Sequence, residues 1–205
     1  MRSIPLNSLR LTPFVFAVMG CAVTAAPPPS GAPEPTRAAS GTAADFQFVR
    51  GMVEHHAQAL AMTALVPERA SSSEIRLLAE RLDVSQRDEI AQLRDWLTRR
   101  GEPAPSDATR DHGPDHSHGS MPGMRTPEQL ARLKAAREAE FDRLFLEHMI
   151  AHHEGALVMI RELFAAPGAG QNPEIFRFAS EIETDQRIEI TRMQQMLAAI
   201  PGGDE

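Results

Sequence analysis

Residues 45–62 read DFQFVRGMVEHHAQALAM, and residues 142–159 read DRLFLEHMIAHHEGALVM. At equal spacing, both stretches carry an aspartate, a phenylalanine, a methionine three residues ahead of a histidine pair, an alanine and a second methionine. Their apolar residues recur at helical intervals, which predicts a helix in each stretch. The shared methionines and histidines are Met52, His55, His56 and Met62 in the first stretch, and Met149, His152, His153 and Met159 in the second.

The repeat continues into the segments that follow. Glu74-Ile75 matches Glu174-Ile175, and the Gln-Arg-x-Glu-Ile pattern at 86–90 recurs at 186–190. Each unit therefore predicts a helical hairpin, which cannot bury its apolar face alone. Two such hairpins packed together predict an all-α four-helix bundle, with hairpin one at 42–100 and hairpin two at 126–200.

Capping and breaking residues predict the bounds of four helices. No stretch alternates as a strand does. The expected helices run from Thr42 to Val66, where Pro67 ends the first; from Ser71 to Gly101; from Thr126 to Ala166, with Gly155 as a weak point; and from Asn172 to just before Pro201.

Helix geometry places the first histidine pair near a methionine. Successive helical residues turn by about 100°, so His55 lies about 60° to one side of Met52 and His56 about 40° to the other. Because these three residues span only about 6 Å along the helix axis, a thioether and one imidazole could bind the same ion. Met62 shares this stripe, which is expected to face the interior.

The second stretch adds a possible ligand at His148. His148 and His152 are four residues apart, a spacing that lets two imidazoles hold one ion from a single helix. Met149 lies beside them. Met159 is about 10 Å further along the axis than His152, so we assign it to a second site or to the core.

Ligand softness indicates which metal these residues suit. Thioether sulfur favours Cu(I), and imidazole accepts both oxidation states of copper. Di-iron helical bundles use Glu-x-x-His pairs, and no such pair occurs in this chain. The pattern therefore favours a copper ion, Cu(I) above all, with silver as a related ligand. In the alternative reading, these residues form a duplicated core whose histidines bond to Asp45, Glu54, Asp142 or Glu154.

The connector at 101–125 is also rich in histidine and methionine, a composition that indicates metal binding. Its alternative reading is a solvated polar loop. The candidate ligands there are His112, His116, His118, Met121 and Met124.

The first 21 residues resemble an export signal, with Arg2 and Arg10 ahead of a short apolar run. That run ends in Val-Met-Gly-Cys, which resembles a lipobox and predicts lipidation of Cys21. The alternative is an ordinary signal peptide that is cut near Ala25. Residues 22–41, rich in Pro and Ala, are expected to be a tether. Either reading places the protein outside the cytoplasm, in the cell envelope, and the first anchors it to the membrane by lipid alone.

The composition argues against several classes of function. A net charge of -7, no Tyr and one Trp disfavour a nucleic-acid partner. The sequence shows no nucleophile with a supporting base, no phosphate-binding glycine loop and no dinucleotide motif. We therefore expect a protein that is not an enzyme.

The two Met-x-x-His-His stretches and Met121-Pro122-Gly123-Met124 resemble the Domain of Unknown Function 305 family, over about residues 43–200. The resemblance implies a ferritin-like four-helix bundle in an exported protein, with some relatives implicated in copper binding and resistance. Gly51 stands where the second stretch has His148, so the two halves need not bind metal equally.

The first hypothesis is a metal sink or carrier that protects the cell envelope from copper or silver and passes the ion to an exporter or metallochaperone. A ferritin-like, metal-dependent oxidase is the second hypothesis. The third is a structural or interaction module whose histidines are merely interior.

Overall fold

The computed structural model describes residues 41–105 and 121–200, and within these ranges the chain is helical with no strand. The all-α prediction is therefore confirmed for the described part of the chain. The predicted export signal with Cys21, nearly all of the tether, and the connector histidines His112, His116 and His118 lie outside the described residues.

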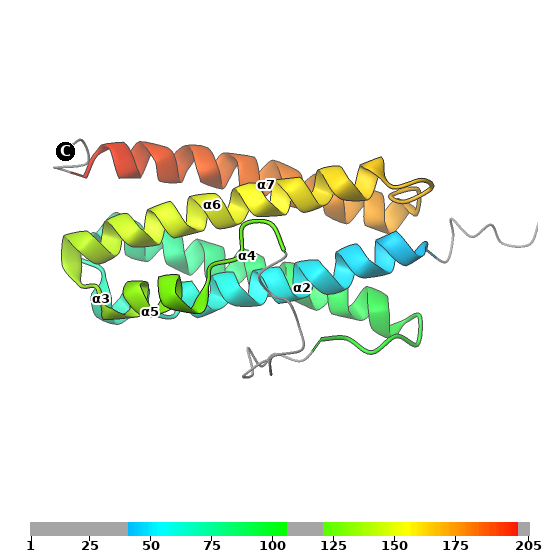
Figure 1. Ribbon diagram of the computed structural model, residues 1–205, viewed down its shortest axis with the longest axis horizontal. Helices are drawn as coiled ribbons and strands as arrows, with labels where there is room; N and C mark the ends of the chain where they lie inside the picture. The colour runs from blue at the N-terminus through cyan, green and yellow to red at the C-terminus, as the bar shows by residue number, and fades with distance from the viewer. Residues whose placement is uncertain (1–40, 106–120, 201–205) are drawn as a thin grey trace, which may run out of the picture. The chain divides into compact units, whose positions relative to one another are not determined.

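Four long helices form two antiparallel pairs (Figure 1). Helices α2 (Ala43–Thr63) and α4 (Ser73–Thr98) pack along each other, as do α6 (Glu138–Ala165) and α7 (Pro173–Ala198). The two pairs meet mainly where α2 packs on α6. Two short helices, α3 (Val66–Arg69) and α5 (Pro127–Ala135), precede α4 and α6. No helix among the described residues is long and apolar enough to cross a membrane.

The predicted helix starts agree closely with the structure. Thr42 and Asp45 form a capping box at α2, and Thr126 and Gln129 form another at α5. Asn172 caps α7 by accepting hydrogen bonds from two backbone amides. The cap of α4 is Ser72, one residue beyond the predicted start.

The first predicted helix end is wrong. Helix α2 stops at Thr63, three residues before the expected end, and Pro67 lies in the first turn of α3. Proline is tolerated there because the first-turn amides of a helix have no intrahelical acceptor.

The predicted helix from Thr126 to Ala166 is also wrong, because it is two helices. Helix α5 ends at Ala135, Arg137 is extended, and Glu138 has a φ of 51°. One turn later, Asp142 accepts hydrogen bonds from Ser71 and Ser72, so the start of α6 is held against the start of α4. Gly155, the expected weak point, does not interrupt α6.

Two aspartates at equivalent repeat positions tie the hairpins together. Asp142 of hairpin two accepts from the backbone amides of Ser71 and Ser72 and from the Ser71 hydroxyl. Asp45 of hairpin one accepts from the backbone amide of Gly170, at 2.7 Å. Each carboxylate therefore holds the turn of the opposite hairpin.

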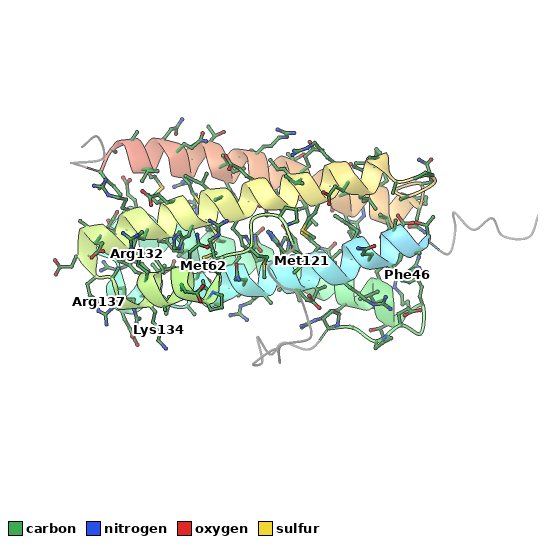
Figure 2. The ribbon with its side chains drawn as sticks, in the orientation of Figure 1. Phe46, Met62, Met121, Arg132, Lys134 and Arg137 are labelled. Atoms are coloured by element: carbon green, nitrogen blue, oxygen red, sulfur yellow. The ribbon has the colours of Figure 1, made fainter. Side chains whose placement is uncertain are left out.

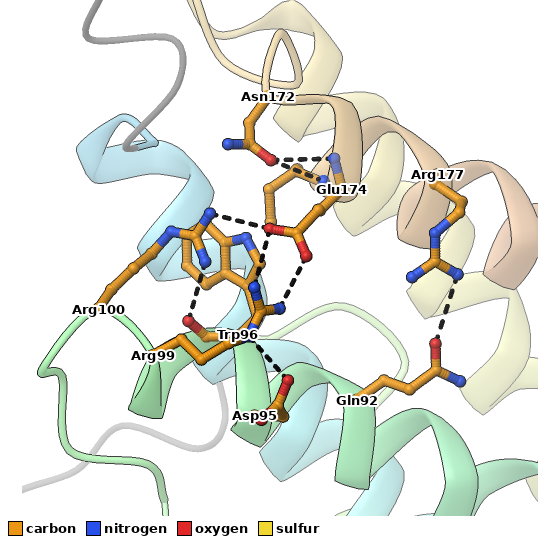
Figure 3. Close-up of polar contacts among 9 residues, drawn as sticks. Gln92, Asp95, Trp96, Arg99, Arg100, Asn172, Glu174 and Arg177 are labelled. Atoms are coloured by element: carbon orange, nitrogen blue, oxygen red, sulfur yellow. Dashed lines mark hydrogen bonds and ion pairs between the residues drawn. The ribbon is translucent and has the colours of Figure 1, made fainter. Parts of the chain in front are cut away.

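A further contact joins α4 to α7 near one end of each helix (Figure 3). The Glu174 carboxylate receives hydrogen bonds from Arg99 and Arg100, at 2.7 and 3.0 Å. The Arg100 guanidinium also lies over the ring of Trp96, 4.0 Å from its centroid. This cluster fixes the register of α4 against α7 outside the region that carries the histidines.

The buried interior forms two apolar clusters, one on each side of the middle of the long helices. One contains Phe48, Met52, Leu93, Trp96, Met159 and Phe178 among others. The other contains Met62, Leu78, Phe141, Phe145, Met149 and Met193 among others. Between the clusters, every long helix contributes polar residues.

Candidate metal centre

A buried polar layer crosses the middle of the four long helices. Along each long helix, the residues of this layer come between those of the two apolar clusters. The histidines and glutamines of the layer are at most 1% exposed, and both glutamate side chains are largely buried. We call these residues the central layer: His55 and His56 of α2, Gln86 and Glu89 of α4, His152 and His153 of α6, and Gln186 and Glu189 of α7.

His55 and His152 form the centre of this layer. Their ring centroids are 3.8 Å apart and their planes are inclined by 34°. His56 lies 6.4 Å from His55, and His153 lies 6.2 Å from His152, between ring centroids. The two predicted histidine pairs therefore converge between α2 and α6, although they are 97 positions apart in the repeat (55 to 152).

The outer two histidines are each bonded to a glutamate of the same hairpin. Nε2 of His56 lies 2.5 Å from the Glu89 carboxylate, and Nε2 of His153 lies 2.8 Å from that of Glu189. Burial alone would raise the pKa of the Glu89 carboxyl, but hydrogen bonds from His56 and Ser85 bring that pKa below its usual value. Glu89 is therefore a charged acceptor.

His55 is held by the segment that precedes α5. Its Nε2 lies 3.0 Å from the carbonyl oxygen of Pro122. Gln58, one turn further along α2, exchanges two hydrogen bonds with the backbone of Arg125, at 2.7 and 3.0 Å. Residues 121–125 are thus fastened to α2, and Met121 lies between Phe46 and Met62 along that helix (Figure 2).

Two glycines allow the same segment to touch α6. A Cβ added to Gly155 would lie 2.1 Å from the Pro122 carbonyl oxygen and 2.4 Å from the Gly123 Cα. Gly123 itself has a φ of 79°. The predicted weak point in α6 is therefore a place of close backbone approach.

The histidines of the layer are short of hydrogen-bond donors. A carbonyl or carboxylate oxygen only accepts, so Nε2 of His55 and of His56 carries a proton, and Nδ1 of the neutral His55 ring is then an acceptor. In the described part of the chain, these buried Nδ1 atoms have no partner, and the same is true of Nδ1 of His153 and Nε2 of His152. Unpaired buried ring nitrogens are costly, and those that accept are what a cation or an ordered water would satisfy.

Burial keeps the central rings neutral. Burial, with His56 beside it, lowers the pKa of His55 to about 3. Burial also lowers the pKa of His152 well below its usual value, with His55 and His153 acting in the same direction. Neutral imidazole is the form that binds metal.

The methionines lie on both sides of the central layer. Met52 and Met159 belong to one apolar cluster and Met62 and Met149 to the other, all at most 9% exposed. Met121 is partly buried against the first cluster, and a Cβ at Gly51 would lie 3.6 Å from its Sδ and 3.2 Å from Met159 Cε. The role of Met121, Met124 and the four core methionines as ligands stays a prediction.

His148 lies apart from the central pair, on the side of α6 near Arg125 and Arg132. Burial, followed by the charges of these two arginines, lowers its pKa. The predicted chelation of one ion by His148 and His152 stays a prediction, and the nearby positive charge opposes a cation there.

No group of three or more His, Cys, Asp or Glu residues in the described ranges is arranged to hold a metal ion. Cu(I) also accepts thioether ligands.

The alternative in which Asp45 and Asp142 pair with the histidines is wrong, because both carboxylates hold turns instead. The glutamates that do pair with histidines, Glu89 and Glu189, were not predicted as site residues. Their signal was present in the sequence, since they occupy matching positions of the repeated Gln-Arg-x-Glu-Ile pattern.

The fold and the layer together define an all-helical protein with paired histidines and methionines in its interior. The chain belongs to the DUF305 family, a domain of unknown function, whose model matches residues 45–197. None of the curated proteins matches the chain.

Solved structures of the family resemble this one. A DUF305 fragment from Deinococcus radiodurans is 34% identical, with a TM-score of 0.65 over 77% of this chain and 97% of its own. A DUF305 protein of Streptomyces coelicolor, described as secreted, is 28% identical, with a TM-score of 0.63 over 78% of this chain and 92% of its own. CopM in its Cu(I)-bound form is 25% identical, with a TM-score of 0.60 over 77% of this chain and 98% of its own. CopM has also been solved with Cu(II) and with silver.

Proposed function

We propose that this protein is an exported, non-enzymatic binder of soft metal ions that takes up Cu(I), and silver in its place, within a ferritin-like four-helix bundle. The observation that carries the proposal is the central layer, where buried neutral imidazoles offer unpaired ring nitrogens between methionine-containing clusters. The metal-bound forms of CopM and the secreted Streptomyces relative support it.

The ion is cargo in this proposal. The protein serves as a sink or carrier in the cell envelope, held to the membrane by a lipid on Cys21, and it passes copper to an exporter or metallochaperone. In this view, His112, His116 and His118 are one set of ligands, and the central layer is a second set.

Anaerobic equilibrium dialysis against Cu(I) and Ag(I) tests the proposal. The full chain is compared with a variant in which His55, His56, His152 and His153 are all Gln, and with a second variant in which the three connector histidines are Gln. We expect the loss of at least one bound ion in the first variant and its retention in the second. Equal binding by the wild type and the first variant would reject the central layer as the site.

The second candidate function is an interaction module in which the central layer only specifies the fold. The carboxylate partners of His56 and His153 favour it, because they satisfy one nitrogen of each ring without metal. It predicts no Cu(I) or Ag(I) bound by the full chain.

A further inference from the structure

Glu89 and Glu189 make the same contact in the two hairpins. Each carboxylate lies within 2.8 Å of Nε2 of a histidine that is fully buried, and in each pair the histidine precedes the glutamate by just over 30 residues: 33 in the first and 36 in the second. Both glutamates are the last polar residue of the repeated Gln-Arg-x-Glu pattern. The arrangement is therefore a property of both halves.

The contact determines which nitrogen of each ring is protonated. An imidazole that binds metal is neutral, with one donor and one acceptor nitrogen, and a carboxylate can only accept. Nε2 of His56 and of His153 therefore carries the proton. The other nitrogen, Nδ1, is buried in both residues and has no partner among the described residues.

The Glu89 carboxylate can hold this arrangement because it is not completely enclosed in the core. Besides His56, it accepts a hydrogen bond from Ser85 at 3.2 Å. It also lines a cavity of about 220 Å³ between α4 and α7. One side of the carboxylate thus faces that cavity while the other faces the buried ring.

We infer that Glu89 and Glu189 are positioning residues of the metal centre, which hold Nε2 of His56 and His153 as donors and leave Nδ1 of each as the atom offered to a metal ion. The inference rests on the proposed function. Histidines that bind metal commonly donate their other ring N–H to a carboxylate, which fixes the tautomer and raises the basicity of the ligand nitrogen. His55 is fixed in the same tautomer by the Pro122 carbonyl, a neutral acceptor.

The tautomers can be observed without metal. Long-range ¹H–¹⁵N correlation spectra of the apo full chain should show His56 and His153 protonated at Nε2 and unprotonated at Nδ1. Glu89→Ala and Glu189→Ala should give mixed tautomers at the histidine concerned. Glu89→Gln and Glu189→Gln should keep the Nε2–H form, since an amide oxygen also accepts. Protonation of Nδ1 in the wild type would overturn the inference.

Metal binding supplies the second readout. On addition of Ag(I), the Nδ1 resonances of His56 and His153 should shift. The Glu89→Ala, Glu189→Ala double variant should bind Cu(I) about 10–100-fold more weakly than the wild type in competition with a chromogenic chelator. The double Gln variant should retain most of the affinity, and Glu181→Ala, which removes an exposed glutamate of α7, should retain all of it.

The outcomes separate this inference from the proposed function. Wild-type affinity in the double Ala variant, or Ag(I) shifts confined to other residues, overturns the positioning role while copper binding stands. Absence of Cu(I) and Ag(I) binding in the wild type rejects the proposed function itself, and the metal-facing role of Nδ1 falls with it.

Discussion

The ring of His55 lies against the ring of His152, with their centroids 3.8 Å apart, and these residues come from α2 and α6, the two helices that join the hairpins. The contact places two neutral bases at the centre of the interior. Both rings are uncharged at neutral pH. We expect the contact between them to persist only while both stay unprotonated.

The stack predicts a loss of stability in acid. The pKa of His55 is lowered to about 3 and that of His152 is lowered as well, so below about pH 6.5 the unfolded chain binds protons that the folded chain does not. The stability is complete above pH 6.5 and is lost as the pH falls towards 3. His55 and His152 each contribute a slope of up to about 1.4 kcal/mol per pH unit in this window.

This effect can be measured by guanidinium unfolding at pH 7 and pH 5. Unfolding is followed through the fluorescence of Trp96, the single tryptophan. His55→Gln should reduce the difference in unfolding free energy between the two pH values. An identical difference in His55→Gln and the wild type would show that His55 is not the group responsible.

Gly155 and Gly51 should respond oppositely to alanine. Both are helical glycines, and alanine is favoured over glycine in a helix by about 1 kcal/mol. At Gly155 the new Cβ would meet backbone atoms at 2.1 and 2.4 Å, whereas at Gly51 it meets only the ends of Met159 and Met121. We expect Gly155→Ala to lower the unfolding free energy by about 1–3 kcal/mol and Gly51→Ala to leave it unchanged or raised.

Thermal and guanidinium unfolding of the two variants checks this pair. The Gly155→Ala variant should also lose the hydrogen bond between His55 and Pro122, seen as a change in the His55 ring resonances. A stabilised Gly155→Ala protein would mean that residues 121–125 do not press on α6 as described.

Asp142 should contribute much more to the unfolding free energy than a surface carboxylate does. It is 3% exposed and accepts three hydrogen bonds from Ser71 and Ser72. We expect Asp142→Ala to lower the unfolding free energy by about 2–4 kcal/mol, since bonds to buried charges are stronger than neutral ones. The control Asp83→Ala removes only a surface ion pair with Arg87 and should cost less than about 0.5 kcal/mol. Equal losses in the two variants would contradict this role of Asp142.

Sequence patterns predicted the features that depend on local spacing. The repeat placed His55, His56, His152 and His153 on inward faces, and all four are buried. The capping boxes at Thr42 and Thr126 follow from side chains three residues apart, and both are present.

The features that the sequence did not predict depend on contacts between distant residues. Ala135 to Glu138 are good helix formers, so the local sequence does not predict the break between α5 and α6. That break accompanies the contact of Asp142 with Ser71 across the hairpins. The close approach of Gly123 to Gly155 likewise joins residues that no periodicity connects.

The location of the bound ion distinguishes a site in the central layer from a site elsewhere in the chain. Crystals of the full chain loaded anaerobically with Cu(I) should be measured at the copper absorption edge. We expect an anomalous peak within bonding distance of a ring nitrogen of at least one of the four central-layer histidines. A peak confined to residues 106–120, or to surface carboxylates, would contradict it.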